Sequence, residues 1–224
     1  MAALIELLEQ SSGGAEVSIQ QVAHRSGLAK SVVYRQFCGR DELERRARGT
    51  VGAELFEIVA TAMDVRHGSI HEILRRTVSV VADWITEHPR LYDFIRSGPA
   101  ADDPEDVDAL RALKANIAAH ARTLVTELGG AVGVIDDPTT DTMTFAIVSM
   151  TEATVSRWAR EPDPLLTREQ LISAVAGYAW HVLDGCARGH QLILDPGLPL
   201  TELITALARD QAASQPTTDP TTGS

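Results

Sequence analysis

Residues 17–43, VSIQQVAHRSGLAKSVVYRQFCGRDEL, decide the fold of this chain. Ser18 and Gln21 form an S-x-x-Q pair, in which the hydroxyl accepts from a backbone N–H and the amide reaches back to the cap, so a helix is predicted to begin there. Gly27 most easily takes the left-handed conformation in which a helix stops and turns. A second short helix is predicted over residues 30–37, with its apolar side chains on one face. Two short helices joined by a tight turn are typical of a helix-turn-helix motif.

The second short helix carries polar side chains at its N-terminus, where backbone N–H groups also lack helical partners. Such a helix end can bind phosphates and base edges together. We predict DNA contacts from the following residues: Ser18, Lys30, Ser31, Val32, Tyr34, Arg35 and Arg40. Ser18 and Arg40 are expected to bind phosphates, and the polar residues of the second helix to make the groove contacts.

The pattern S-I-x-x-V-A-x-x-S-G-L-A-K-S-V-V-Y-R-Q-F followed by G-R-D-E-L, over residues 18–43, closely resembles the DNA-binding segment of TetR-family repressors. This resemblance implies an all-α chain, in which an N-terminal three-helix DNA-binding domain precedes a C-terminal helical domain for ligand binding and dimerisation. It also implies a palindromic double-stranded DNA operator as partner. A small-molecule effector would then release the protein from that operator.

Three features depart from the family pattern. Family members usually have a longer first helix after a basic arm, whereas here Met1 runs almost directly into the apolar Leu4. Either the arm is missing or the true start lies upstream. Ala29 takes the capping position of the second short helix, where Ser is common, and Ala is a poorer cap by roughly 1 kcal/mol. The next helix opens with Gly39 and Arg40 where Lys is common, although Arg still binds phosphate through two parallel hydrogen bonds.

The charge of the chain is unevenly distributed. The 224 residues carry a formal net charge of −11, whereas nucleic-acid binders usually carry a basic excess. Residues 25–48, however, hold seven Lys and Arg against three Asp and Glu, while residues 49–224 hold 13 against 25. We therefore expect a locally basic DNA-binding segment on an acidic body, with strongly salt-dependent binding. The run Arg45, Arg46, Arg48 fits a solvated helix face as well as it fits phosphate contact.

Several function classes lack support in the sequence. There is no secretory signal and no run of 18 apolar residues, so we expect a cytoplasmic protein without a membrane partner. The two cysteines lack metal-ligand spacing, and Gly68 with a predicted helix start separates His67 from His71, so neither a metal site nor a cofactor is predicted. No G-x-S-x-G motif, P-loop or dinucleotide fingerprint is present, so no enzyme is predicted.

The residues beyond the motif have helical periodicity. Helices are predicted over residues 40–63, 69–88, 90–96, 107–128, 139–160, 168–188 and 198–209. Pro89 and the pair Gly129-Gly130 are expected to end the second and fourth of these, and the acidic segment 98–106 to form an exposed loop. The predicted domains are a DNA-binding domain (1–48), a regulatory and dimerisation domain (49–212) and a disordered tail (213–224).

The two long helices near the C-terminus contain interleaved small residues, such as Ala146 and Ala153 in one and Ala174 and Gly177 in the other. Small residues let helices approach closely, and two such hairpins from two copies can form a four-helix interface. Ordinary packing within one chain is the alternative. A homodimer would match the two-fold symmetry of a palindromic operator.

A ligand pocket between the middle helices is a further expectation from the resemblance. Its candidate lining residues are Trp84, His88, Tyr92, Phe94, Ile117, His120, Phe145 and Trp158. For each of these, core packing is the alternative, because aromatic residues at helical spacing usually pack against their neighbours.

Taken together, the residues and the resemblance predict a DNA-binding transcriptional regulator, specifically a repressor released by a small-molecule effector. The alternative is a helical small-molecule-binding protein without DNA binding, which the missing basic arm and Ala29 favour. A weaker alternative is an enzyme whose catalytic residues come together only on folding.

Overall fold

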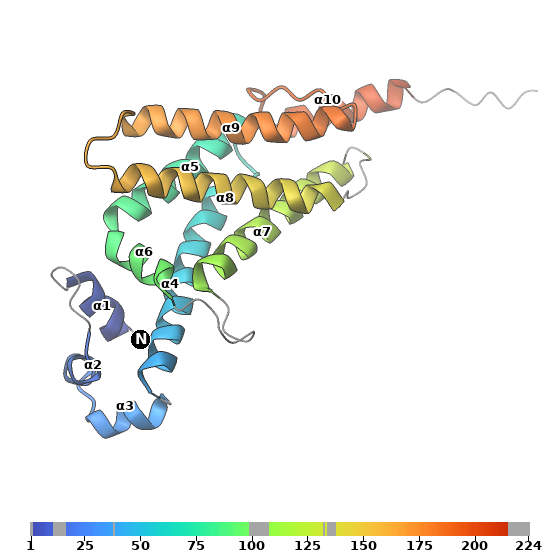
Figure 1. The fold of residues 1–224 in the computed structure, drawn as a ribbon. Helices are drawn as coiled ribbons and strands as arrows, with labels where there is room; N and C mark the ends of the chain where they lie inside the picture. The colour runs from blue at the N-terminus through green and yellow to red at the C-terminus, as the bar shows by residue number, and fades with distance from the viewer. Residues whose placement is uncertain are drawn as a thin grey trace, which may run out of the picture.

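The fold is all-α, as predicted (Figure 1). The computed structural model describes residues 2–10, 17–37, 39–98, 108–131, 133 and 138–214, apart from the side chains of Tyr34 and of residues 210–214. Within these ranges the helices are α1 Ala2–Gln10, α2 Ile19–Ser26, α3 Lys30–Gln36, α4 Arg40–Ala62, α5 Ile70–Glu87, α6 Pro89–Arg96, α7 Ala109–Ala131, α8 Pro138–Arg160, α9 Arg168–Gly189 and α10 Leu200–Ser214. In that part of the chain no helix is long and apolar enough to cross a membrane.

The first three helices and the start of α4 form a small N-terminal unit with its own core (Figure 1). Leu4 of α1, Val22 of α2 and Leu43 of α4 are buried together in this core. Arg25 of α2 donates to the Glu6 carboxylate at 3.0 Å, which ties α2 to α1. The helix-turn-helix motif is therefore held in this unit by a shared apolar core and by the contact between Arg25 and Glu6.

The long helix α4 connects the N-terminal unit to the body formed by α5–α10 (Figure 1). It stays continuous through Gly49 and Gly52, although a glycine costs a helix about 1 kcal/mol relative to Ala. Val51 and Leu55 are buried in the main core, so tertiary packing offsets this cost.

Local signals set most helix ends in the body as predicted. Ser69 caps α5, and Glu72 closes the capping box by accepting from the Ser69 N–H at 2.8 Å. These hydrogen bonds hold the pKa of Glu72 below its usual value. Pro89 ends α5 and occupies the first turn of α6, where its missing N–H costs nothing.

Two of the predicted helix ends are wrong. The pair Gly129-Gly130 does not end α7, which includes both glycines and continues one residue further, to Ala131. The last helix, α10, begins at Leu200 and extends to Ser214, so it overlaps residues 213–214 of the predicted tail. Residues 215–224, and residues 99–106 of the predicted acidic loop, lie outside the described residues.

The short helix α6 lies between the N-terminal unit and the body (Figure 1). Its Ile95 is completely buried in the main core. The Phe94 carbonyl accepts from Arg48 of α4 at 3.1 Å, and the Arg48 guanidinium lies 4.6 Å from the centroid of the Phe94 ring. At the start of α6, the His88 ring lies 2.8 Å from the Glu9 carboxylate of α1. Helix α6 therefore contacts both the N-terminal unit and the core of the body.

The segment before α10 is fixed to the start of α5. The His71 N–H donates to the Pro196 carbonyl at 3.1 Å, and the Leu200 N–H donates to the Gly68 carbonyl at 3.0 Å. Leu200 and Leu203 are buried. This arrangement places α10 against α7, so that α10 contributes to the wall of the cavity described below.

Candidate nucleic-acid interface and apolar cavity

The helix-turn-helix geometry follows from local hydrogen bonds. The Ser18 hydroxyl accepts from the Gln21 N–H at 3.2 Å, and the Gln21 side chain accepts from the Ser18 N–H at 2.8 Å, so the predicted capping box is present. Gly27 has a φ of 68° and ends α2, while the Leu28 N–H donates to the Ala23 carbonyl at 3.0 Å. The chain therefore leaves α2 in a fixed direction and enters α3 three residues later.

We expect the change Gly27→Ala to lower the free energy of unfolding by about 1 kcal/mol, because a side chain in the left-handed region costs about 1–2 kcal/mol. Gly130→Ala is the matched control: Gly130 is helical and exposed, and a Cβ there meets nothing within 4 Å. That control should raise stability by about 0.5–1 kcal/mol. Urea unfolding followed by circular dichroism measures both. Equal effects of the two changes would contradict the role assigned to Gly27.

The exposed side of α3 carries the predicted groove contacts. Lys30, Ser31 and Arg35 are exposed, Val32 is half-buried, and Val33 packs inward. The side chain of Tyr34 lies outside the described part of the structure. The N-cap of α3 is Ala29, which makes no side-chain cap hydrogen bond, as predicted. The start of α3 thus combines exposed polar side chains with a helix end that its own cap residue does not satisfy.

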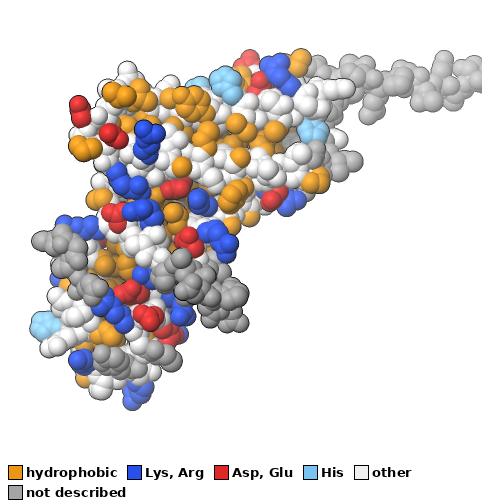
Figure 2. Space-filling view, in the orientation of Figure 1, with side chains coloured by type: hydrophobic (Ala, Val, Ile, Leu, Met, Phe, Trp, Pro, Cys, Tyr) orange, Lys and Arg blue, Asp and Glu red, His pale blue; other side chains and the backbone are white. Residues whose placement is uncertain are grey.

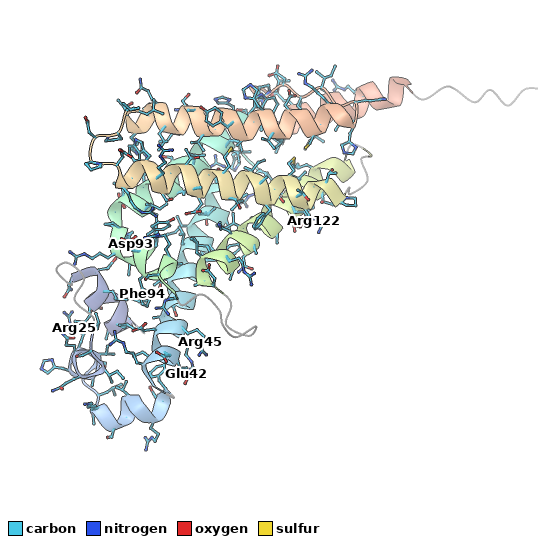
Figure 3. The ribbon with its side chains drawn as sticks, in the orientation of Figure 1. Arg25, Glu42, Arg45, Asp93, Phe94 and Arg122 are labelled. Atoms are coloured by element: carbon cyan, nitrogen blue, oxygen red, sulfur yellow. The ribbon has the colours of Figure 1, made fainter. Side chains whose placement is uncertain are left out.

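Several basic residues of the segment 25–48 are paired with carboxylates. Arg40 and Arg48 both contact Glu44, at 2.6 and 2.9 Å, and Arg46 contacts Glu42 at 2.5 Å. Arg25 points toward α1 (Figure 3), where it contacts Glu6 as described above. Ion pairing therefore weakens the basic field along α4. Arg40 still lies at the N-terminus of α4, where a phosphate is favoured.

An apolar cavity of about 300 Å³ lies in the body, among helices α4 to α10. Its wall is mainly aliphatic, with Leu55, Ile73, Val78, Leu113, Ile117 and Met143 as examples. Among the described residues that line it, Tyr92 alone is a Phe, Tyr or Trp. The volume lies at the lower end of the range of small-molecule sites, about 300–1,000 Å³.

A polar cluster from three helices, Tyr92 of α6, Lys114 of α7 and Glu152 of α8, forms part of the cavity wall. The Tyr92 hydroxyl donates to one oxygen of the Glu152 carboxylate, and the Lys114 ammonium lies 3.6 Å from the other. Burial, together with the Glu152 hydrogen bond, raises the pKa of Tyr92 to about 12. The phenol therefore stays protonated at neutral pH and keeps its hydrogen available to Glu152.

Of the eight predicted ligand-binding residues, Tyr92 and Ile117 line the cavity. The other six lie elsewhere: Trp84 is buried in the core, His88 contacts Glu9, Phe94 lies under Arg48, His120 makes an edge contact with Phe56, Phe145 is exposed, and Trp158 donates to the Leu166 carbonyl. The proposed site does not include these six, because periodicity alone does not show which side of a buried helix borders a void.

Two polar residues of the cavity, Lys114 and Glu152, were absent from the sequence prediction. A signal for Lys114 was present, since it stands between Leu113 and Ile117 on the apolar side of α7. A charged residue in an apolar helical stripe is uncommon unless it is paired. Its partner, on another helix 38 positions away, could not be identified from this pattern.

Helices α8 and α9 carry large apolar side chains on their surface. Phe145 of α8 is 42% exposed, and Tyr178 and Val182 of α9 are 55% and 37% exposed. Figure 2 shows hydrophobic side chains gathered over these two helices on one face of the molecule. Contiguous apolar surface of this kind is a common mark of a protein–protein interface.

This architecture is similar to that of known transcriptional regulators. No family model matches the chain. An uncharacterized HTH-type transcriptional regulator of Mycobacterium tuberculosis is 21% identical over 178 residues, which cover 77% of this chain and 71% of that protein. The crystal structure of a TetR-family transcriptional regulator from Streptomyces coelicolor matches with a TM-score of 0.62 at 20% identity, over 98% of this chain and 89% of that one. A TetR-like transcriptional regulator from Rhodococcus matches with a TM-score of 0.55 at 19% identity, over 82% and 93%. The resemblance carried by residues 18–43 thus extends to the whole architecture, and the chain has the fold of TetR-family transcriptional regulators.

Proposed function

We propose that this chain is a homodimeric, DNA-binding transcriptional regulator, and that a small molecule in the apolar cavity releases it from its operator. The observation that carries the proposal is the exposed side of α3, with Lys30, Ser31 and Arg35, positioned by the capped helix α2 and the turn at Gly27. The similarity to regulators of known structure supports it. The proposed DNA-binding domain comprises residues 1–48, and the proposed regulatory and dimerisation domain comprises residues 49–212. The boundary between them lies inside α4.

Dimerisation is part of the proposal because a single helix-turn-helix buries too little surface for selective binding. The exposed apolar side chains of α8 and α9 are the proposed contact between two copies. A two-fold dimer would present two copies of α3 to the two halves of a palindromic operator. A repressor bound there would exclude other proteins from the same DNA.

A route from the cavity to the DNA-binding helices supports the effector part of the proposal. Tyr92 of α6 lines the cavity, and Phe94, two residues further on, accepts from Arg48 of α4. A ligand that shifts α6 would therefore also move its contacts with the N-terminal unit. Such a ligand changes operator affinity only if it binds the two conformations with different affinity.

The first experiment is selection of binding sites from a library of random DNA duplexes with the purified full-length chain, together with DNA from the region upstream of its own gene. We expect a palindromic site, bound in the presence of unrelated competitor DNA and more weakly at higher salt. If only competitor-sensitive binding is found, DNA reading is rejected and the alternative, a helical small-molecule-binding protein, is favoured.

We expect Lys30→Ala to weaken operator binding. If Lys30 contacts a base, the loss should be about 1–3 kcal/mol at one operator position, and sequence preference there should relax. If it contacts a phosphate, affinity should fall equally for all DNA sequences. The slope of the logarithm of the binding constant against the logarithm of the salt concentration should then decrease in magnitude by about 1. Gel-shift titrations at several salt concentrations separate these results.

The matched control for Lys30→Ala is Arg66→Ala, which removes the same charge from an exposed position of the body, where Arg66 pairs with Asp64. Its operator affinity should stay close to that of the wild type. Equal affinities for the two variants would remove Lys30 from the proposed interface.

A further inference from the structure

The cavity wall favours one shape of ligand. It is built from aliphatic side chains of six helices, and planar aromatic side chains that could stack on a flat ligand are nearly absent from its described part. The wall also has polar side chains: Thr77, Thr126, Thr139, Thr140, Thr144, Thr151, Cys186 and His190. The hydroxyls of Thr77 and Thr144 donate to carbonyls of their own helices at 2.9 and 3.0 Å. The wall is nevertheless mainly apolar, so it offers dispersion contacts along most of its length.

The volume limits the size of the ligand. A cavity of about 300 Å³ holds about ten non-hydrogen atoms, if each takes about the 30 Å³ that a water molecule occupies in the liquid. A flexible aliphatic chain of that length can follow an irregular wall by rotation about single bonds. A rigid polycyclic molecule of equal volume cannot.

The polar cluster selects the head group. Lys114 and Glu152 compensate each other's charge, and the buried Tyr92, only 3% exposed, is neutral. A carboxylate head would meet the Glu152 carboxylate, and an ammonium head would meet Lys114, so either would leave a like charge nearby in a mainly apolar site. A neutral oxygen can accept from the Lys114 ammonium, which has three N–H donors, and a hydroxyl head can also donate to Glu152.

We propose that the cavity binds a neutral, unbranched aliphatic molecule of about ten non-hydrogen atoms, whose oxygen-containing head lies at Tyr92, Lys114 and Glu152. The inference deepens the proposed function, because it names the chemical class of the effector, and it rests on that proposal only for the regulatory role. Binding itself can be measured without DNA.

The direct test is calorimetric titration of the full-length chain with four probes: 1-decanol, decanoate, decylamine and 1-naphthol. We expect 1-decanol to bind roughly tenfold tighter than decanoate and decylamine, because a mismatched polar group costs about that factor. It should also bind tighter than 1-naphthol, whose rigid ring cannot follow the irregular wall. Decanoate and decylamine keep the chain and change the head charge, while 1-naphthol keeps the hydroxyl and replaces the chain by a flat ring. The inference is overturned if no probe binds, or if one of the other three binds as tightly as 1-decanol.

Two variants test the placement of the head group. Glu152→Gln keeps an acceptor for the Tyr92 hydroxyl but leaves Lys114 as a net positive charge, so preference should move toward decanoate. Lys114→Met leaves Glu152 as a net negative charge and should move preference toward decylamine. Glu161→Gln, at an exposed position just after α8, is the matched control and should keep the wild-type order of probes.

These opposite shifts distinguish recognition of a head group from a purely structural role, which would weaken all probes alike. Circular dichroism shows whether each variant is folded, and either variant alone suffices for the test. Equal weakening of every probe in a folded variant would contradict the placement at Lys114 and Glu152.

Failure of the ligand class and failure of the proposed function give different results. If the chain binds its selected DNA site but none of the probes, the ligand class is wrong and DNA reading stands. If 1-decanol binds with the expected preference but leaves operator affinity unchanged, the ligand class stands and the effector role is wrong.

Discussion

Replacing Val182 by Asp is expected to convert a dimer into monomers and to lower the affinity for a palindromic operator at least about a hundredfold. Val182 lies on α9, one turn after Tyr178, and both side chains are exposed in the single chain. In the proposed dimer a carboxylate at this position would be buried without a partner, which costs several kcal/mol, and two-fold symmetry introduces it twice. Sedimentation equilibrium measures the oligomeric state, and gel-shift titration measures operator affinity.

The control for this change is Ile193→Asp, which introduces the same charge at a position that is 75% exposed and outside α8 and α9. This variant should remain a dimer and keep its operator affinity. A Val182→Asp protein that stays dimeric with wild-type affinity would show that two copies associate through another surface. Helicity by circular dichroism should be equal in both variants, because both sites are exposed in the monomer.

Replacing Ile95 by Ala is expected to cause the largest loss of stability among these variants, about 2–5 kcal/mol of the free energy of unfolding. Ile95 is completely buried, and its helix α6 contacts both the N-terminal unit and the body. The deletion removes apolar contacts and leaves a void that the surrounding helices fill only in part. Urea unfolding at fixed protein concentration measures the loss.

The matched control is Ile193→Ala, the same chemical change at an exposed position, which should stay within about 0.5 kcal/mol of the wild type. Similar unfolding midpoints for the two variants would argue against the central position of α6. Because α6 also holds Arg48 through the Phe94 carbonyl, Ile95→Ala should in addition weaken operator binding below the unfolding transition.

The two variants together separate assembly from folding. Val182→Asp should act on the association of two chains and leave each chain folded, whereas Ile95→Ala should act within one chain. Operator affinity is expected to fall in both cases, so the combination of sedimentation with unfolding data shows which step is lost.

The sequence of residues 17–43 was sufficient to predict the helix-turn-helix motif, including the capping box at Ser18, the turn at Gly27 and the uncapped start of α3 at Ala29. In the body, Ser69 and Pro89 marked the limits of α5 equally well. These features depend on hydrogen bonds and backbone preferences between residues a few positions apart. Their physical cause is therefore contained in a short stretch of sequence.

Other properties depend on partners far apart in the sequence, and only the tertiary structure decided them. Gly49 and Gly52 did not interrupt α4, because burial of Val51 and Leu55 in the main core offset a local penalty of about 1 kcal/mol for each glycine. Arg40, a predicted phosphate contact, and Arg46, from the run that fitted phosphate contact equally well, turned out to be paired with carboxylates.

The cavity is the clearest example of a property that the sequence pattern did not predict. Periodicity predicts that a side chain is buried, but it does not predict whether that side chain meets a neighbour or a void, since this depends on how several helices pack together. Of the eight residues proposed from the sequence, Tyr92 and Ile117 reached the cavity, while Lys114 and Glu152 met across two helices without a local signal for their pairing. Local signals thus determined the helices and the motif of this protein. The packing of distant helices determined its ion pairs, its cavity and the surface left exposed on α8 and α9.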